Sequence, residues 1–247
     1  MSQDVKPVED VGVICLVVSM TLEAVIFDWG GTLTPWHTVD LGDCWLAVAG
    51  DEAQARALRA AEDALWVASR DQHRSATFDD IPTNAELTLT DDQRRAYYRW
   101  WDEHSYTDPA VIPTLTALRK RGLKIGVLSN TIWPRVEHER IFSRDSVGHL
   151  IDGAVYTSEI AWTKPHREAF NAALAAVGVT DPARAVFVGD RLFDDIHGAK
   201  QAGLHAVHLP HSDIPLWQTT GVEGHPDAVI HDLAELVDVI DGWLAAG

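Results

Sequence analysis

An apolar run that stops at an aspartate and two glycines constrains the fold of this chain most. Residues 22–27 are apolar apart from Glu23 and form a run short enough for a buried strand, and Asp28 follows them directly. Gly30 and Gly31 come next, and glycine lets backbone approach the end of a strand closely. Open α/β sheets bind ligands at the carboxyl ends of their strands, so Asp28 stands where such a sheet carries functional groups. An ordinary Asp-Gly-type turn would look the same in isolation, and the downstream segments decide between the two.

Strand-like and helix-like segments alternate along most of the chain. Further strands are expected at 123–128, 153–156, 185–188 and 205–209, with a weaker one at 228–230. Helices are expected at 108–121, 165–177, 194–202 and 231–244. This alternation predicts an α/β fold, a Rossmann-like three-layer arrangement in which helices cover both faces of a parallel sheet.

Residues 35–107 interrupt this alternation. They have little strand character, and helices are expected at 51–70 and at 90–104, where Thr90 resembles a helix N-cap. The sequence therefore predicts a helical cap domain at 35–107, inserted after the first strand of a core made of 20–34 and 108–247. Residues 1–19 would form an N-terminal extension, either dispensable or packed on the body as an extra strand or helix.

The acidic composition restricts the partners and the setting. The formal net charge is −17, and a phosphate backbone is bound by patches of Lys and Arg, so no nucleic-acid partner is expected. The apolar run 11–20 is too short to cross a bilayer and lacks the basic start of a signal peptide. Cys15 and Cys44 show neither a zinc-site spacing nor a disulfide framework. We expect a cytoplasmic protein without membrane association, and the sequence leaves a homodimer open.

Polar residues follow four of the expected strands. Because the carboxyl ends of parallel strands share one edge of a sheet, these residues should lie close together. A carboxylate can attack phosphorus, a hydroxyl and an amide can hold phosphoryl oxygens, and a lysine offsets negative charge. Crowded carboxylates repel one another unless a cation joins them, and an oxygen-only site with phosphate suits Mg²⁺. The residues are Asp28, Ser129, Asn130, Lys164, Asp190, Asp194 and Asp195.

The order and spacing of these groups resemble the four motifs of the haloacid dehalogenase-like (HAD) hydrolases, over about residues 22–236. The matching segments are Asp28-Trp29-Gly30-Gly31-Thr32-Leu33, Leu128-Ser129-Asn130, Lys164-Pro165, and Val188-Gly189-Asp190 with Asp194-Asp195-Ile196. Each segment alone is a weak signal, whereas the four in order are a strong one.

The resemblance implies a role for each motif residue. Asp28 would be the nucleophile, and Lys164 would pair with it and with the phosphoryl oxygens. Ser129 and Asn130 would bind the transferring group, with Thr32 beside them in the substrate site. The helical insertion would be a mobile cap that closes over this site and excludes water.

The resemblance also implies a metal site. Mg²⁺ would be bound by Asp28, by the backbone oxygen of Gly30 and by Asp190. Asp195 is the fourth expected ligand, acting directly or through water, with its neighbour Asp194 as the alternative.

One departure from the family pattern bears on activity. Phosphatases of the family carry a second aspartate two residues after the nucleophile, as general acid and base, and this chain has Gly30 there. Family members without that aspartate include dehalogenases, which need no metal, and phosphonoacetaldehyde hydrolases, which recruit a cap lysine. The acidic fourth motif argues against a dehalogenase. Residues 35–107 contain no lysine, which argues against a phosphonoacetaldehyde hydrolase. Three explanations stay open: another group such as His37 supplies the proton, the leaving group needs none, or the chain is a slow enzyme that serves as a binder.

Substrate contacts outside the motifs are expected from the cap and its joint. Arg70, His73 and Arg74 form a small basic cluster, and His37 follows the first motif. A solvated helix end is the alternative for the cluster, and a plain hinge residue for His37. Zinc has little support, because no other ligand set accompanies the three alternating histidines, which are His205, His208 and His211.

Together these features predict a Mg²⁺-dependent hydrolase that acts on a small phosphorylated metabolite through an aspartyl-phosphate on Asp28. The alternative is a weak or inactive HAD-like protein that binds phosphate, a metabolite or a partner, because Gly30 replaces the second aspartate.

Overall fold

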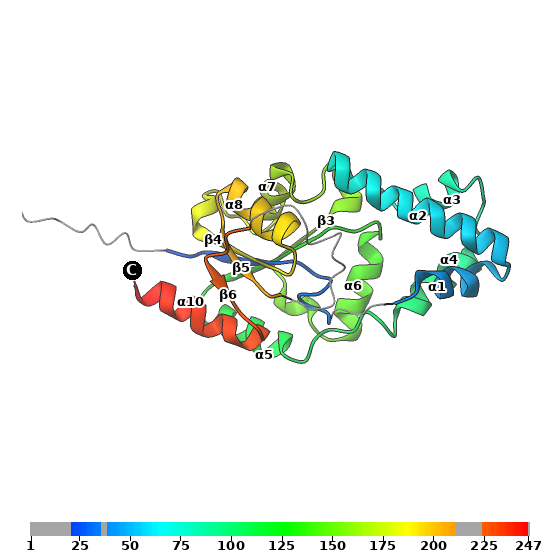
Figure 1. Cartoon of the computed structure of the whole chain (residues 1–247). Helices are drawn as coiled ribbons and strands as arrows, with labels where there is room; N and C mark the ends of the chain where they lie inside the picture. Colours follow the sequence, from blue (N-terminus) through cyan, green and yellow to red (C-terminus); the bar gives the residue numbers. More distant parts are fainter. Residues whose placement is uncertain (1–20, 36–38, 211–223, 247) are drawn as a thin grey trace, which may run out of the picture.

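A six-stranded parallel sheet forms the centre of the molecule (Figure 1). The computed structural model describes residues 21–35, 39–210 and 224–246. The strand order is β3-β2-β1-β4-β5-β6, and every neighbouring pair is parallel. The strands are β1 (Ala24–Phe27), β2 (Lys124–Ser129), β3 (Gly153–Tyr156), β4 (Ala185–Gly189), β5 (His205–His208) and β6 (Ala228–Val229).

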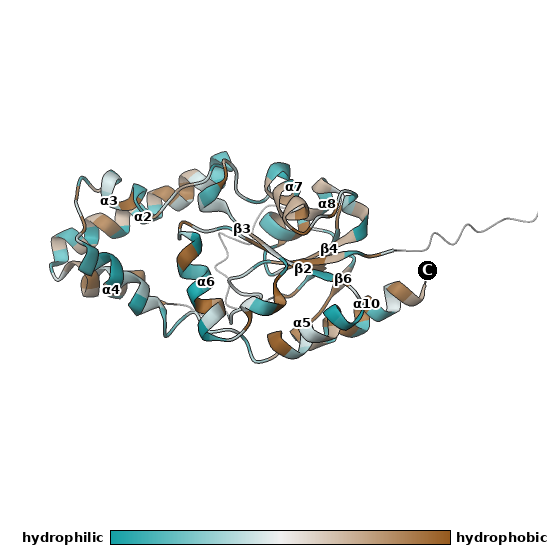
Figure 2. Ribbon diagram, turned by 180° about the vertical axis from the view of Figure 1, so that it is seen from behind, coloured by the Kyte–Doolittle hydropathy of each residue, from teal (hydrophilic) through white to brown (hydrophobic). Residues whose placement is uncertain are grey.

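Helices cover both faces of this sheet, which confirms the predicted three-layer α/β fold. One face packs against α5 and α10, and the other against α7 and α8, so the strands are apolar on both sides (Figure 2). These helices are α5 (Val111–Lys120), α7 (Arg167–Ala176), α8 (Gly198–Ala202) and α10 (Leu236–Ala245). Short 3₁₀ turns η1 (Gly148–Leu150), η2 (Thr157–Glu159), η3 (Pro182–Arg184) and η5 (Leu233–Glu235) connect them.

The order of the strands reverses beside β1. The chain runs outward from β1 through β2 to β3, and then returns to the other side of β1 with β4. Such a switch point leaves a crevice at the carboxyl ends of the two central strands, where open α/β folds bind ligands. Asp28 follows β1 and Asp190 follows β4, so both flank this crevice.

A helical insertion separates β1 from α5, and we use that name for α1–α4. The helices are α1 (Leu41–Ala49), α2 (Glu52–Gln72), α3 (Asp80–Asn84) and α4 (Asp91–Trp101). The expected N-cap at Thr90 is a full capping box with Gln93. The apolar core of the insertion extends onto Ile132 and Trp133, which follow β2, so the insertion packs on the loop beside the sheet edge.

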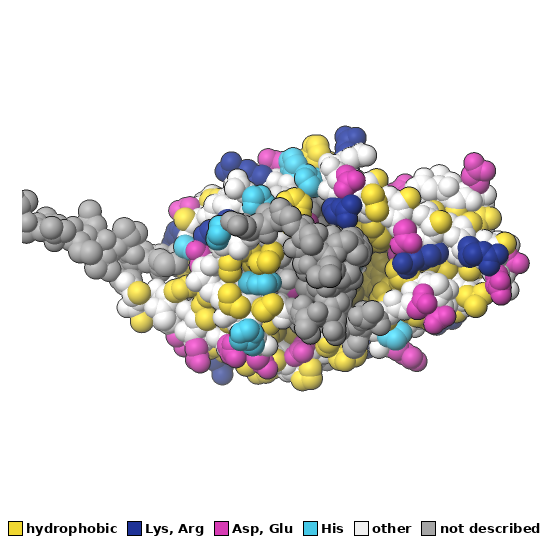
Figure 3. Space-filling view, viewed as in Figure 1, with side chains coloured by type: hydrophobic (Ala, Val, Ile, Leu, Met, Phe, Trp, Pro, Cys, Tyr) yellow, Lys and Arg dark blue, Asp and Glu magenta, His cyan; other side chains and the backbone are white. Residues whose placement is uncertain are grey.

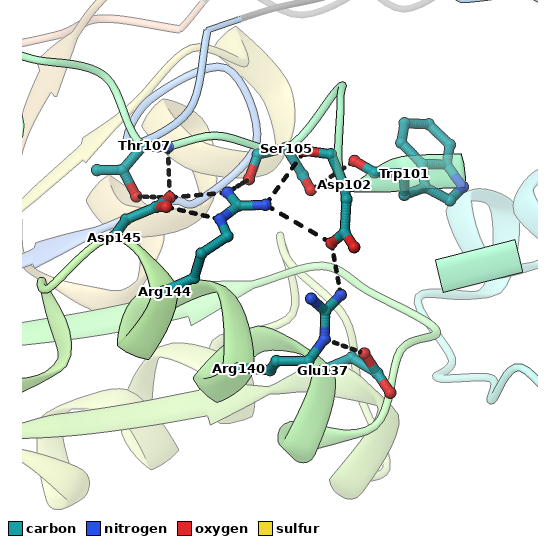
Figure 4. Close-up of polar contacts among 8 residues, drawn as sticks. All are labelled: Trp101, Asp102, Ser105, Thr107, Glu137, Arg140, Arg144 and Asp145. Carbon is teal, nitrogen blue, oxygen red and sulfur yellow. Dashed lines mark hydrogen bonds and ion pairs between the residues drawn. The ribbon is translucent and has the colours of Figure 1, made fainter. Parts of the chain in front are cut away.

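The polypeptide that leaves the insertion is held against α6 (Arg135–Arg144), which the sequence did not predict (Figure 4). Arg144 donates to the backbone oxygens of Asp102 (3.1 Å) and Ser105 (2.9 Å), and Arg140 pairs with the Asp102 carboxylate at 2.7 Å. A helix with this many charged residues buries only a narrow apolar stripe, so the spacing of its apolar residues did not indicate a helix.

The helix expected at 194–202 is two elements. A π-helix, η4 (Leu192–His197), precedes α8. The Asp195 carboxylate accepts the backbone N–H of Arg191 at 2.9 Å, which fixes this wider turn next to the sheet edge.

The described surface has mixed charge on the face of Figure 3, where basic and acidic side chains are interspersed. No helix within residues 21–35, 39–210 and 224–246 has the length and apolar character needed to cross a membrane.

Candidate active site

Four strand-end residues meet in a buried cluster at the switch point. The Lys164 ammonium donates to Asp28 Oδ1 and to Asp195 Oδ1, both at 2.6 Å. Ligand oxygens of Asp28, Asp190 and Asp195 lie within 4.8 Å of one another. Lys164 is 3% exposed and none of the three aspartates exceeds 6%, so the charges interact with little screening by water. The sequence therefore correctly predicted that these four side chains come together.

The electrostatics of the cluster favour a cation. Burial raises the pKa of Asp28 to about 6 and that of Asp190 well above its ordinary value, although Lys164 and Arg191 respectively oppose these shifts. Burial acts to lower the pKa of Lys164, but the charges of Asp195 and Asp28 more than offset it. The raised pKa values mean that burial destabilises the ionised carboxylates of Asp28 and Asp190, and a bound cation would stabilise them.

The donor set fits a divalent metal ion. Asp190 Oδ1 is buried and has no hydrogen-bond partner among the described residues, whereas Asp190 Oδ2 accepts from Arg191 Nε at 3.1 Å. An unpartnered buried carboxylate oxygen is costly, and a hard cation with oxygen ligands relieves that cost. The Asp28, Asp190 and Asp195 cluster could therefore hold a metal ion. Asp194, beside Asp195, lies outside this group, and burial raises its pKa to about 7.

Two glycines make room for these carboxylates. A Cβ on Gly31 would lie 2.7 Å from Asp190 Oδ2, and Gly31 has φ +84°. A Cβ on Gly189 would collide with the Asp195 carboxyl group. Both positions therefore require glycine, one of them also for its backbone conformation.

Gly30 differs from these two glycines. A Cβ built there meets no atom of the described residues within 4 Å. The place where family phosphatases carry their second aspartate is therefore not filled by a neighbouring side chain of the described chain. The expectation that the Gly30 backbone oxygen binds metal stays a prediction.

Asn130 has a different contact from the one predicted. Its amide oxygen accepts the Lys164 N–H at 2.8 Å, and its amide nitrogen donates to the Lys164 backbone oxygen at 3.1 Å. Asn130 therefore holds the backbone of the lysine, and its predicted contact with substrate stays untested. Ser129 ends β2 and is buried. Thr32 is also buried, and its Oγ1 has no hydrogen-bond partner within the described part of the chain.

The two arginines of the insertion that were predicted to contact substrate have different partners. Arg70 is exposed and donates to Asp71 at 3.1 Å. Arg74 lies over the ring of Trp162, two residues before Lys164, so it is near the motif loop. His37 and residues 1–19 lie outside the described residues.

The histidines considered for zinc have other partners. His205 Nε2 contacts the backbone oxygen of Ala183 at 3.1 Å, and His208 Nε2 that of Asp190 at 3.1 Å. His211 is not among the described residues. Within the described chain, the acidic cluster at the switch point is the one group with metal-ligand proximity.

Sequence reasoning missed two neighbours of the site. Arg191 pairs with Asp190 and donates its backbone N–H to Asp195. Its position directly after a motif aspartate was a usable signal. Trp162 contacts Arg74 across the seam between insertion and core, and no local pattern could indicate such a long-range pair.

Comparison with known proteins gives the family. The model of the haloacid dehalogenase-like hydrolases matches residues 22–203. Among curated proteins, a glyceraldehyde 3-phosphate phosphatase of Methanopyrus kandleri is 34% identical over 132 residues, 53% of this chain and 55% of that protein, so the match spans about half of the relative's length. A phosphonoacetaldehyde hydrolase of Pseudomonas paraeruginosa is 28% identical over 205 residues, 76% of this chain and 73% of the relative.

Solved structures share the fold. A HAD phosphatase from Thermococcus onnurineus has a TM-score of 0.65 at 23% identity, over 90% of this chain and 99% of that one. The L-2-haloacid dehalogenase of Xanthobacter autotrophicus has a TM-score of 0.62 at 19% identity, with the same coverage. Since the family model covers well over half of the sequence and its motif residues meet in one buried cluster, this chain belongs to the haloacid dehalogenase-like hydrolases.

Proposed function

We propose that the protein is a Mg²⁺-dependent phosphatase that hydrolyses a small phosphorylated metabolite through an aspartyl-phosphate on Asp28. The observation that carries the proposal is the Lys164 ammonium, held at 2.6 Å from both Asp28 and Asp195 beside an unpartnered oxygen of Asp190. A buried lysine in this place offsets the negative charge that a phosphoryl group brings to an aspartate nucleophile.

The chemistry needs two displacements at phosphorus. An Asp28 carboxylate oxygen forms a bond to phosphorus while the bond to the alcohol oxygen of the substrate breaks, and the departing oxygen takes up a proton from water. Water then attacks the aspartyl-phosphate, which releases phosphate and regenerates the carboxylate. Lys164 would pair with the phosphoryl oxygens, and Ser129 would donate to them. Mg²⁺, held by Asp28, Asp190 and Asp195, would neutralise charge that builds up on the phosphoryl group.

The helical insertion would serve as the cap over this site. Its Phe78 donates a backbone N–H to Ile132 O at 2.8 Å, and Ile132 follows Ser129 and Asn130 closely in the chain. Trp133, from the same loop, packs in the apolar core of the insertion. This contact supports a cap that excludes water from the nucleophile.

The phosphatase relative supports the substrate class and the phosphonoacetaldehyde hydrolase relative supports chemistry at phosphorus, each only as a similar protein. The absence of lysine from residues 35–107 argues against a mechanism that needs a lysine from the insertion. Space for a side-chain carbon at Gly30 is open among the described residues, so no described neighbour blocks that position.

An aryl phosphate tests the proposal, because an aryl leaving group needs little protonation. We expect Mg²⁺-dependent turnover by the wild type that is lost in Asp28→Asn. Gly30→Asp should raise turnover of alkyl phosphates at least about tenfold, because a well-placed general acid–base group contributes about 10²–10⁴-fold. Gly30→Ala, which adds no acid, is the matched control. No wild-type turnover at high enzyme concentration would overturn the phosphatase proposal in favour of the binder.

A further inference from the structure

The end of α2 is paired with the loop that carries Lys164. Thr163 donates its backbone N–H to His73 O at 3.0 Å, and Ser75 donates its N–H to Ala161 O at 3.3 Å. These two bonds flank an antiparallel bridge between Arg74 and Trp162. We call residues 73–75 and 161–163 together the tether, because they join the helical insertion to the core directly before the lysine.

Side chains reinforce the tether. The Arg74 guanidinium carbon lies 5.7 Å from the centroid of the Trp162 ring. The Trp162 ring also stacks on His166, with ring centroids 4.1 Å apart and an interplanar angle of 7°. His166 in turn caps α7, since its Nδ1 accepts the Glu168 N–H at 3.2 Å. The stack therefore connects the insertion to a helix of the core.

Lys164 is held from two directions as a result. Asn130 binds its backbone N–H and its backbone oxygen from the core side, and the tether fixes the preceding residue, Thr163, from the insertion. A lysine side chain is a flexible four-carbon stem, so its ammonium is placed only as well as its backbone is held. Here that ammonium must reach Asp28 and Asp195 together.

We infer that Arg74 and Trp162 are positioning residues: the tether keeps the Lys164 ammonium between Asp28 and Asp195, so that docking of the helical insertion sets the charge balance at the nucleophile. The consequence for turnover rests on the proposed function, whereas the placement of the ammonium does not. The two can therefore be tested separately.

A cysteine pair makes the tether reversible. Opposed residues of an antiparallel bridge have Cα atoms about 4.5–5.5 Å apart, within the range of a disulfide. Arg74→Cys with Trp162→Cys would be prepared in a Cys15→Ser background, with the buried Cys44 left in place. Removing both side chains loosens the tether in the reduced protein, and oxidation closes it again.

The first readout is independent of activity. An amine-acetylating reagent is followed by mass spectrometry, with acetylation of Lys164 measured relative to Lys124 and Lys200, whose side chains are 58% and 35% exposed. We expect Lys164 to react about tenfold faster in the reduced pair than in the wild type, and to be protected again after oxidation. Equal protection in the reduced pair and the wild type would overturn the inference, whatever the activity.

The second readout separates positioning from binding. In the reduced pair, kcat for an aryl phosphate should fall about tenfold with KM within about twofold, and oxidation should restore kcat. Trp162→Phe keeps the ring stack and should resemble the wild type, whereas Trp162→Ala should resemble the reduced pair. These two variants also test the inference if the double-cysteine protein does not fold. Arg56→Ala, whose side chain on α2 is 72% exposed and lies outside the tether, should change neither readout. Equal kcat in Trp162→Ala and Trp162→Phe, with Lys164 protected in both, would also overturn the inference.

Discussion

Within the described residues, buried carboxylates lie in two places, and their surroundings differ. At the switch point Lys164 bridges Asp28 and Asp195. Asp190 pairs with Arg191, and its other oxygen has no hydrogen-bond partner among the described residues. Inside the helical insertion a single carboxylate, Glu62, is 2% exposed and accepts from the Trp45 indole at 2.7 Å and from the Tyr97 hydroxyl at 3.5 Å.

The difference separates a site from a structural group. Glu62 is alone and both of its oxygens accept from neutral donors of the same core, which leaves nothing for a ligand to satisfy. The three aspartates repel one another and are incompletely neutralised, so a metal ion or a phosphoryl group gains from entering. Burial of an acid therefore indicates function here only where charge and hydrogen bonding are left unbalanced.

Asp28→Asn gives the largest expected effect. The amide cannot attack phosphorus, so aryl phosphate turnover should fall at least about 10³-fold. Stability should change by less than about 1 kcal/mol, because Lys164 keeps Asp195 as a partner and one buried charge is removed. Kinetics and thermal unfolding of the same preparation check both statements. Glu62→Gln is the matched control, and it should leave turnover unchanged; a loss in both variants would erase the contrast between the two clusters.

Gly31→Ala should have the next largest effect. The new methyl group would meet Asp190 Oδ2 at 2.7 Å in a left-handed backbone conformation, and we expect a loss of about 1–3 kcal/mol in the free energy of unfolding. Turnover should also fall, because the displaced carboxylate belongs to the acidic cluster. Gly30→Ala, one residue away in open space, should stay within about 0.5 kcal/mol. Chemical denaturation of the two variants measures both losses. Equal losses would contradict the argument that a methyl group at position 31 collides with Asp190.

The sequence revealed the switch-point cluster more fully than the insertion. Asp28 and Asp190 follow apolar strands, and parallel strands share an edge, so their meeting followed from local patterns. On α2, Leu58, Ala61 and Leu65 recur at helical spacing and are buried, whereas Ala68, which continues that spacing, is exposed. Glu62 was not foreseen, because a charged residue is assigned to the surface unless its partners are known. The hydrogen bonds of Asn130 to the Lys164 backbone and the tether were also not predicted, because both depend on residues far apart in the chain.

Glu62→Gln should change the pH dependence of stability. Burial raises the pKa of Glu62, although the indole donors of Trp45 and Trp66 oppose the shift. A carboxyl group with a raised pKa in the folded state binds its proton more tightly there, so its contribution to stability is lost as pH rises through the folded value. We expect the variant to match the wild type near pH 4 and to be about 1 kcal/mol more stable near pH 8. Denaturation at several pH values checks this, and a variant less stable throughout would mean that the donors favour the ionised group.

A partly exposed carboxylate, Asp102, serves as a reference for the buried ones, and its removal should have the smallest effect on stability. Asp102 pairs with Arg140 at 2.7 Å where the chain leaves the insertion, with side chains 33% and 39% exposed (Figure 4). Water screens such a pair, so a double-mutant cycle of Asp102→Ala and Arg140→Ala should give a coupling energy below about 1 kcal/mol that shrinks with added salt. Arg144→Ala should destabilise more, by about 1–2 kcal/mol, because it also removes donors from the backbone oxygens of Asp102 and Ser105. A coupling energy near that of a buried pair would mean that exposure does not separate structural from functional carboxylates in this chain.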